Sequence, residues 1–133
     1  MEPLDSLTKR SKNSAARLTK NSKIFKTIIA AIQEKKGENI VSLDLRKITE
    51  AVSDFFIVCE ASSQPQVRAI AQNIEQRVKE NCGENVFHKE GLQNLQWVLM
   101  DYVNAVVHIM LPENRKFYAI EEMWNDAVRA EHS

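Results

Sequence analysis

The chain has 133 residues, of which 44 % are apolar and 27 % charged, an ordinary composition for one globular domain. Seven bases and two acids give the first 26 residues a net charge of +5, so the remainder carries −5, which excludes a uniformly basic, nucleic-acid-binding domain. No run approaches the roughly 18 apolar residues of a membrane span, and no apolar segment follows the basic start as in a secretory signal. Two cysteines are too few for a disulfide scaffold, so we expect a cytoplasmic protein with reduced thiols.

Residues 1–21 are expected to form a disordered, basic N-terminal arm. They contain Pro3, several serine and asparagine residues and no helical stripe of apolar side chains. Such a segment cannot bury enough apolar surface to offset the entropy lost on ordering. Two roles stay open for it: nonspecific contact with phosphate, as in ribosomal RNA, and a solvated tail.

The first half of the domain predicts a helix followed by two strands. The helix begins near Ser22, and Gly37 is expected to end it in the left-handed C′ position. Its buried stripe consists of Ile24, Phe25, Ile28, Ile29 and Ile32. Alternation from Asn39 to Leu45 predicts a half-buried strand. The continuous apolar run from Phe55 to Cys59 predicts a strand buried on both faces.

A second helix follows, with Ser63 at its start, Pro65 in its first turn and Gly83 at its end. Residues 86–89 are a short strand candidate. Residues 97–102 and 105–111 are stronger candidates, separated by a connection of hairpin length.

The C-terminal segment predicts a helix, because four large apolar residues recur at a spacing of three to four. These residues are Phe117, Ile120, Trp124 and Val128. The element order is then α-β-β-α-β-β-β-α. Strands on both sides of a helix predict an α/β (α+β) fold over residues 22–130, with a mixed sheet of about five strands flanked by helices.

No constellation of residues indicates catalysis, a metal or a cofactor. The three glycines lie far apart, and no cysteine and histidine spacing suits zinc. Cys59 and His108 could form a nucleophile pair if their strands were neighbours, but an apolar run raises a thiol pKa. Asp54 and Asp101 are interpreted as turn acids. We therefore expect a protein that is not an enzyme.

Aromatic and charged residues gather around the predicted hairpin and its exits. Alternation places Trp97 and Asp101 on one face of their strand and Tyr102 on the other. Exposed Trp, Tyr and Arg are typical of protein–protein hot spots. From spacing alone, Trp97 and Tyr102 are better interpreted as core aromatics. The candidate partner-binding residues are Glu90, Gly91, Trp97, Asp101, Tyr102, His108 and Arg115.

An ordered series of short motifs resembles the ribosome silencing factors, also called the Iojap-like family. The resemblance covers about residues 22–127, and the basic arm lies outside it. The motifs are residues 53–58, Ser63, residues 66–71, Glu90–Gly91, residues 97–102, Val107–His108, residues 115–118, Glu121 and Trp124.

The resemblance implies a fold and a function. The fold is a mixed sheet flanked by helices, related to nucleotidyltransferases. Members bind the large ribosomal subunit through its ribosomal protein number fourteen, on the face that meets the small subunit. They block subunit joining, lower translation when nutrients are short, and are not known as enzymes.

The same resemblance implies that Trp97 and Tyr102 contact the partner, with Asp101 and Glu90 nearby, and so reverses the interpretation from spacing. The family usually has glycine where Val103 stands. Because valine is poorly suited to a positive φ, we expect a different hairpin geometry here, with Asn104 in the left-handed position.

Three alternatives stay open. A nucleotidyltransferase-like enzyme or nucleotide-binding protein rests on fold analogy alone. A homodimer could form through an exposed edge strand. An organelle is the alternative to a bacterial cytosol.

Overall fold

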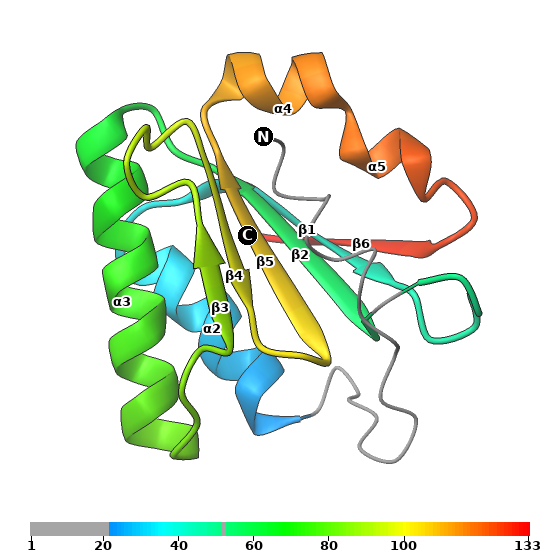
Figure 1. Ribbon diagram of the computed structural model, residues 1–133, viewed down its shortest axis with the longest axis horizontal. Coiled ribbons are helices and arrows are strands. Elements are labelled where there is room, and N and C mark those ends of the chain that lie inside the picture. The colour runs from blue at the N-terminus through cyan, green and yellow to red at the C-terminus, as the bar shows by residue number, and fades with distance from the viewer. Residues whose placement is uncertain (1–21, 52) are drawn as a thin grey trace.

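The computed structural model describes residues 22–51 and 53–133, so the predicted basic arm lies outside the described residues. Within that part, six strands form one sheet in the order β3-β4-β5-β2-β1-β6 (Figure 1). Strands β2 and β5 run parallel, and the other neighbouring pairs are antiparallel. The predicted mixed sheet with flanking helices is therefore confirmed. The elements are α2 (Lys23–Glu34), β1 (Glu38–Asp44), β2 (Phe55–Glu60), α3 (Gln64–Cys82), β3 (His88–Glu90), β4 (Trp97–Asp101), β5 (Ala105–Met110), α4 (Pro112–Tyr118), α5 (Ile120–Met123) and β6 (Val128–His132).

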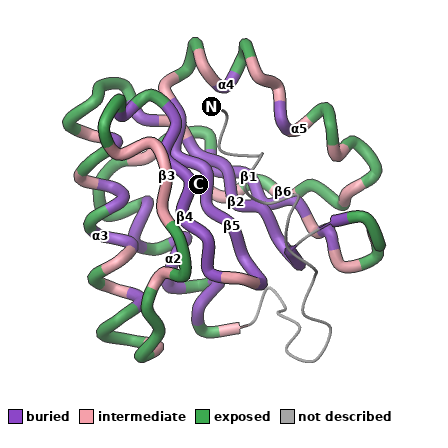
Figure 2. Tube along the Cα trace, in the orientation of Figure 1, coloured by how far each residue is buried: buried purple, intermediate pink, exposed green. Residues whose placement is uncertain are grey.

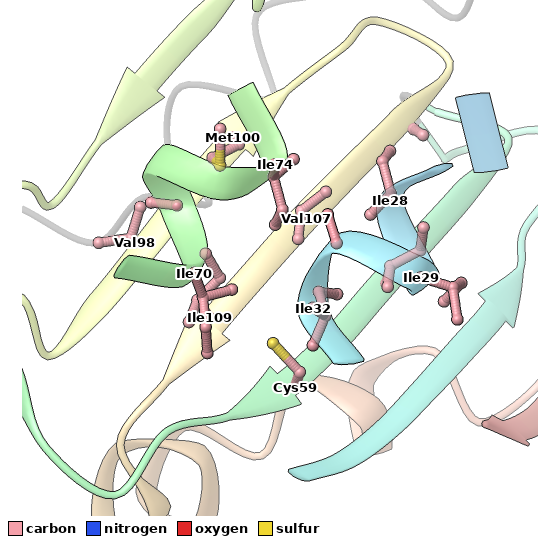
Figure 3. Packing of buried hydrophobic residues seen from close by; sticks show 14 of the residues in the cluster. Ile28, Ile29, Ile32, Cys59, Ile70, Ile74, Val98, Met100, Val107 and Ile109 are labelled. Atoms are coloured by element: carbon pink, nitrogen blue, oxygen red, sulfur yellow. The ribbon is translucent and has the colours of Figure 1, made fainter. Parts of the chain in front are cut away.

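Helices α2 and α3 cover one face of the sheet and form the larger core with it. Their apolar stripes at helical spacing meet the side chains that alternate strand residues point to this face. Figure 3 shows Ile28 and Ile32 of α2 and Ile70 of α3 packed over Val107 and Ile109 of β5. The stripe predicted for α2 is thus confirmed, and α3 buries a stripe of its own.

Helices α2 and α3 are capped by different residues. At α3, Gly83 has a φ of 68° as predicted, and at the other end the Ser63 hydroxyl accepts a hydrogen bond from the Gln66 amide at 3.3 Å. At α2, the left-handed residue is Lys36, with a φ of 65°. The role predicted for Gly37 is wrong. Its missing side chain instead admits Ile32, with which a Cβ would collide.

The opposite face of the sheet carries two smaller apolar clusters. One includes Phe56, Leu99 and Val106, against which Trp124 packs. The other joins Trp97 to Ile120 of α5. Helices α4 and α5 lie at one end of the sheet (top of Figure 1), and Figure 2 shows that much of their outer surface is exposed. The core strands β2, β4 and β5 are buried on both faces.

The predicted C-terminal helix is wrong beyond Tyr118. Ala119 has a φ of 47°, which ends α4, and the chain continues as the short helix α5 and then as strand β6 along β1. Of the supposed apolar stripe, Ile120 is buried, but Phe117 and Val128 are 80 % and 62 % exposed. The spacing therefore does not mark one helix, because Phe117 lies in α4, Ile120 in α5 and Val128 in β6, while Trp124 follows α5.

Pairing with β6 changes the surroundings of β1, which is not half-buried as predicted. Ser42 is fully buried, and its hydroxyl lies 2.9 Å from Nε2 of His132 on β6. Strand β3 also differs from its prediction, because it covers His88–Glu90 rather than residues 86–89.

The hairpin between β4 and β5 is built on a strained residue. Val103 has a φ of 72°, so the expectation that Asn104 would take the left-handed position is wrong. The Asn104 amide donates to the Tyr102 carbonyl at 2.9 Å, and the Asp101 carboxylate accepts from the Val103 amide at 2.7 Å. The Asn104 carbonyl in turn accepts from the amides of Asp54 and Phe55 at the start of β2. These bonds hold the turn in place against its local preference.

We expect Val103→Gly to raise the free energy of unfolding by about 1 kcal/mol. Relief of roughly 1–2 kcal/mol of left-handed strain exceeds the ~0.5–1 kcal/mol entropic cost of a glycine. Urea unfolding followed by circular dichroism measures the difference. The matched control is Val128→Gly, at an exposed strand position without a positive φ, which should lower stability. Equal losses for both variants would contradict a strained turn.

Candidate functional site

The predicted partner-binding residues do not form one surface. Trp97 and Tyr102 lie at opposite ends of β4, separated by roughly 16 Å at about 3.3 Å per residue, and they point to opposite faces of the sheet. Each is only 5 % exposed, so the expectation that both face solvent as aromatic anchors is wrong. Tyr102 belongs to the core beneath α3, where burial raises the pKa of its hydroxyl.

Trp97 is joined to His108 by a buried hydrogen bond. Its indole Nε1–H donates to Nδ1 of His108 at 3.0 Å, and His108 is fully buried. An accepting Nδ1 fixes the neutral imidazole with its proton on Nε2, which has no hydrogen-bond partner among the described residues. Burial lowers the pKa of His108 to about 3, so the ring is neutral at physiological pH.

A series of ring contacts leads from this hydrogen bond to the surface. Tyr118 of α4 packs against Trp97 with ring centroids 4.7 Å apart and the ring planes tilted by 46°. Phe117 meets Tyr118 edge to face at 5.0 Å and 90°. Phe117 is 80 % exposed. We call His108, Trp97, Tyr118 and Phe117 the aromatic chain. It connects the buried centre of β5 to a large apolar side chain in water.

A groove of about 420 Å³ lies beside Trp97 and Tyr118. Because most of its lining is polar and carries several side-chain amides, we call it the amide groove. Gly91 has a φ of 88°, and a Cβ there would collide with the Trp97 backbone, so only glycine fits this turn. The structure therefore brings together Glu90, Gly91 and Trp97 of the predicted set. The groove is lined by Lys89, Glu90, Gly91, Leu92, Gln93, Asn94, Gln96, Trp97, Asn114 and Tyr118.

Arg115 fastens α4 to the rest of the protein. It is 8 % exposed and forms a two-bonded ion pair with Glu121 of α5, at 2.8 and 3.1 Å. Its Nη1 also donates to Glu60 at 3.1 Å and to the carbonyl of Asn39 at 2.6 Å. Although burial opposes the charge, hydrogen bonding to Glu121 keeps the pKa of Arg115 above its ordinary value. The same bond lowers the pKa of Glu121.

The geometry excludes the nucleophile pair considered from the sequence. In the parallel pairing of β2 with β5, His108 lies opposite Val58, so Cys59 points to the other face of the sheet. Burial raises the pKa of the Cys59 thiol to about 12. The Asp101 carboxylate serves the hairpin turn, as interpreted from the sequence.

Residues 22–51 and 53–133 contain no group of three or more His, Cys, Asp or Glu side chains arranged to hold a metal ion. Within the same ranges, every helix is too short or too polar to cross a bilayer.

Sequence reasoning missed Phe117 as an exposed residue. A signal was present in the spacing within α4. Arg115 and Tyr118 are three residues apart, so they share one helix face, and Phe117 lies about 100° away from Tyr118. If that shared face packs on the sheet, Phe117 must point elsewhere.

Comparisons with known proteins identify the family. A family model described as ribosomal silencing factor during starvation matches residues 18–133. The ribosomal silencing factor RsfS of Bacillus subtilis is 38% identical over 108 residues, which is 81% of this chain and 90% of that protein. The chloroplastic protein Iojap of Zea mays is 32% identical over 108 residues, 79% of this chain and 45% of that protein. The crystal structure of a Chromobacterium violaceum protein superposes with a TM-score of 0.73 at 37% identity, over 77% of this chain and 83% of that chain.

The low pKa of His108 makes stability depend on pH. An unfolded histidine binds a proton below pH ~6.5, whereas the folded one stays neutral until about pH 3, so stability falls as pH drops through this window. Between pH 7 and pH 5 we expect a loss of about 2 kcal/mol, at up to ~1.36 kcal/mol per pH unit. Urea unfolding at each pH measures it. His108→Gln can still accept from Trp97 and should flatten the dependence. An unchanged slope in His108→Gln would contradict this assignment.

Proposed function

Because the chain belongs to the ribosomal silencing factor family, we propose that it represses translation by binding the large ribosomal subunit on the face that meets the small subunit. The observation that carries the proposal is the family match over residues 18–133, together with a fold shared with a solved relative at 37% identity. The ordered series of motifs in the sequence supports the same assignment, because the family that it resembles binds that subunit on that face. We infer that the protein works in the cytoplasm.

The partner on that subunit is its ribosomal protein number fourteen. Support comes from charge, because the chain after residue 26 carries −5 and proteins of the large subunit are usually basic. We place the contact at the amide groove, where Glu90 and Gly91 are partly exposed, and on α4, whose Asn114 and Tyr118 line the same groove. Trp97, His108 and Arg115 then act from inside the domain, as supports of that surface. Asp101 and Tyr102 support the hairpin at the far end of β4.

Repression by this route needs no chemical step. A folded domain bound on the joining face occupies volume that the small subunit must fill, so association is blocked while the domain stays bound. An interface of standard size buries roughly 800 Å² on each partner, which a domain of this size can supply. Affinity and concentration then set the degree of repression.

We expect the purified protein to migrate with the large subunit in a sucrose gradient of separated subunits. Added before the subunits are mixed, it should lower the yield of joined ribosomes in proportion to its occupancy of the large subunit. Light scattering at joining concentrations of Mg²⁺ gives the second readout. Co-migration with the small subunit alone, or with neither subunit, would sink the proposal. Binding to the large subunit with undiminished joining would sink the steric mechanism.

The basic arm, residues 1–21, is proposed to add nonspecific contacts to ribosomal RNA. The support is its sequence alone, which carries more bases than acids. Contacts between such bases and phosphates release counterions and make affinity depend on salt. The bases are Lys9, Arg10, Lys12, Arg17 and Lys20.

We expect replacement of these five bases by glutamine to lower the salt dependence of large-subunit binding. The slope of log affinity against log salt should fall by about 2 or more, at roughly 0.7–0.9 per lost phosphate contact. Binding titrations between 50 and about 200 mM KCl measure it. Exchange of Lys for Arg and Arg for Lys at the same positions keeps the charge and is the control. If the glutamine variant retains the full slope, the arm does not contact RNA.

A further inference from the structure

We propose that Phe117 is the residue that anchors the partner, and that buried Trp97 and Arg115 hold α4 so that Phe117 is presented in one orientation. The partner surface that fits is an apolar pocket surrounded by basic side chains on a ribosomal protein. This inference rests on the proposed function and specifies the residue that does the binding.

The first support is the exposure of Phe117. Its ring is 80 % accessible although it stands on a helix that packs on the sheet. Burial of a phenylalanine side chain in an apolar pocket is favourable, and aromatic residues are over-represented in interfaces. A single exposed apolar side chain is common and by itself indicates nothing. What distinguishes Phe117 is how its position is fixed.

Helix α4 cannot hold that position by itself. It has seven residues, too few for a stable isolated helix, so its place comes from tertiary contacts. Near the start of its packed face, Arg115 donates to Glu60, Glu121 and the Asn39 carbonyl. One turn later on the same face, Tyr118 packs against Trp97, whose ring is fixed by the bond to His108.

Phe117 stands between these two fixed points and packs edge to face on Tyr118. A side chain already held in its bound orientation loses less entropy on binding, and this saving appears as affinity. The arrangement therefore suits an anchor better than it suits a neutral surface position.

Charge around Phe117 selects the kind of partner. Glu113, Glu122 and Asp126 are exposed on α4, on α5 and after it, against the exposed bases Lys116 of α4 and Arg129 of β6. The charge of Arg129 is already paired with Glu121. Such a surface repels RNA phosphates and complements a basic protein. Stacking of Phe117 on a nucleotide base is the competing possibility, and the test below separates the two.

The decisive comparison is Phe117→Ala against Phe87→Ala. Phe87 is also highly exposed, at 67 %, but it lies near the other end of β4, where its amide donates to the Asp101 carbonyl. We expect Phe117→Ala to weaken binding to the large subunit at least tenfold and Phe87→Ala to change it less than threefold. Both variants should unfold at nearly the same urea midpoint as the wild type, as exposed substitutions do. Phe117→Leu should retain part of the affinity.

A double-mutant cycle tests the positioning role of Trp97. Trp97→Phe keeps a ring against Tyr118 but removes the hydrogen bond to His108. If Trp97 acts through Phe117, the substitution weakens binding in the wild type and has little further effect in the Phe117→Ala background. Equal losses in both backgrounds would overturn the positioning role.

Three outcomes separate the possibilities. If the wild-type protein does not bind the large subunit, the proposed function fails. If the wild type binds and Phe117→Ala binds equally well, the inference fails while the proposed function stands. If Phe117→Ala also loses tenfold in binding to deproteinised large-subunit RNA, Phe117 stacks on RNA and the protein partner is overturned.

Discussion

The hydrogen bond from the Trp97 indole to His108 is the constraint on which the functional end of the molecule depends. It is formed in an apolar interior, where a charged imidazole would be costly, so burial and bond together select one neutral tautomer. An indole held by its nitrogen has little freedom to rotate. Its face is therefore a fixed platform for Tyr118, and the position of α4 follows from that platform.

A second constraint acts on the same packed face of α4, through charge instead of ring packing. Arg115 is nearly buried, and a guanidinium without partners would be strongly destabilising there. Glu121 and Glu60 supply the countercharge, and Arg129 of β6 shares Glu121 at 2.8 Å. One network thus connects α4, α5, β2 and β6. The C-terminal strand that completes the sheet is tied to the same helix that carries Phe117.

Much of the fold could be predicted because its signals are local. The stripe from Ile24 to Ile32 and the two faces of β4 follow from periodicity, and the structure confirms both. Strand β6 could not be predicted, because its partner β1 lies about 90 residues earlier in the sequence, as the contact between Ser42 and His132 shows. The prediction that Val103 would avoid a positive φ was wrong for the same reason. The local preference of β-branched residues is overridden by hydrogen bonds from the start of β2 to the Asn104 carbonyl. Alternation also placed Trp97 on the correct face, but it cannot reveal that α4 would cover that face.

Because the motif residue Trp97 is buried, it has little surface with which to touch a partner. A side chain that is 5 % exposed contributes almost no contact area, so Trp97 can act on a partner only through what it positions. The proposed steric repression needs this kind of support, because a domain that moves on its contact leaves space for the competing subunit part of the time. Rigidity in α4 and affinity at Phe117 are then two consequences of the same buried contacts. The sequence motif is better understood as the framework of the binding surface than as the surface itself.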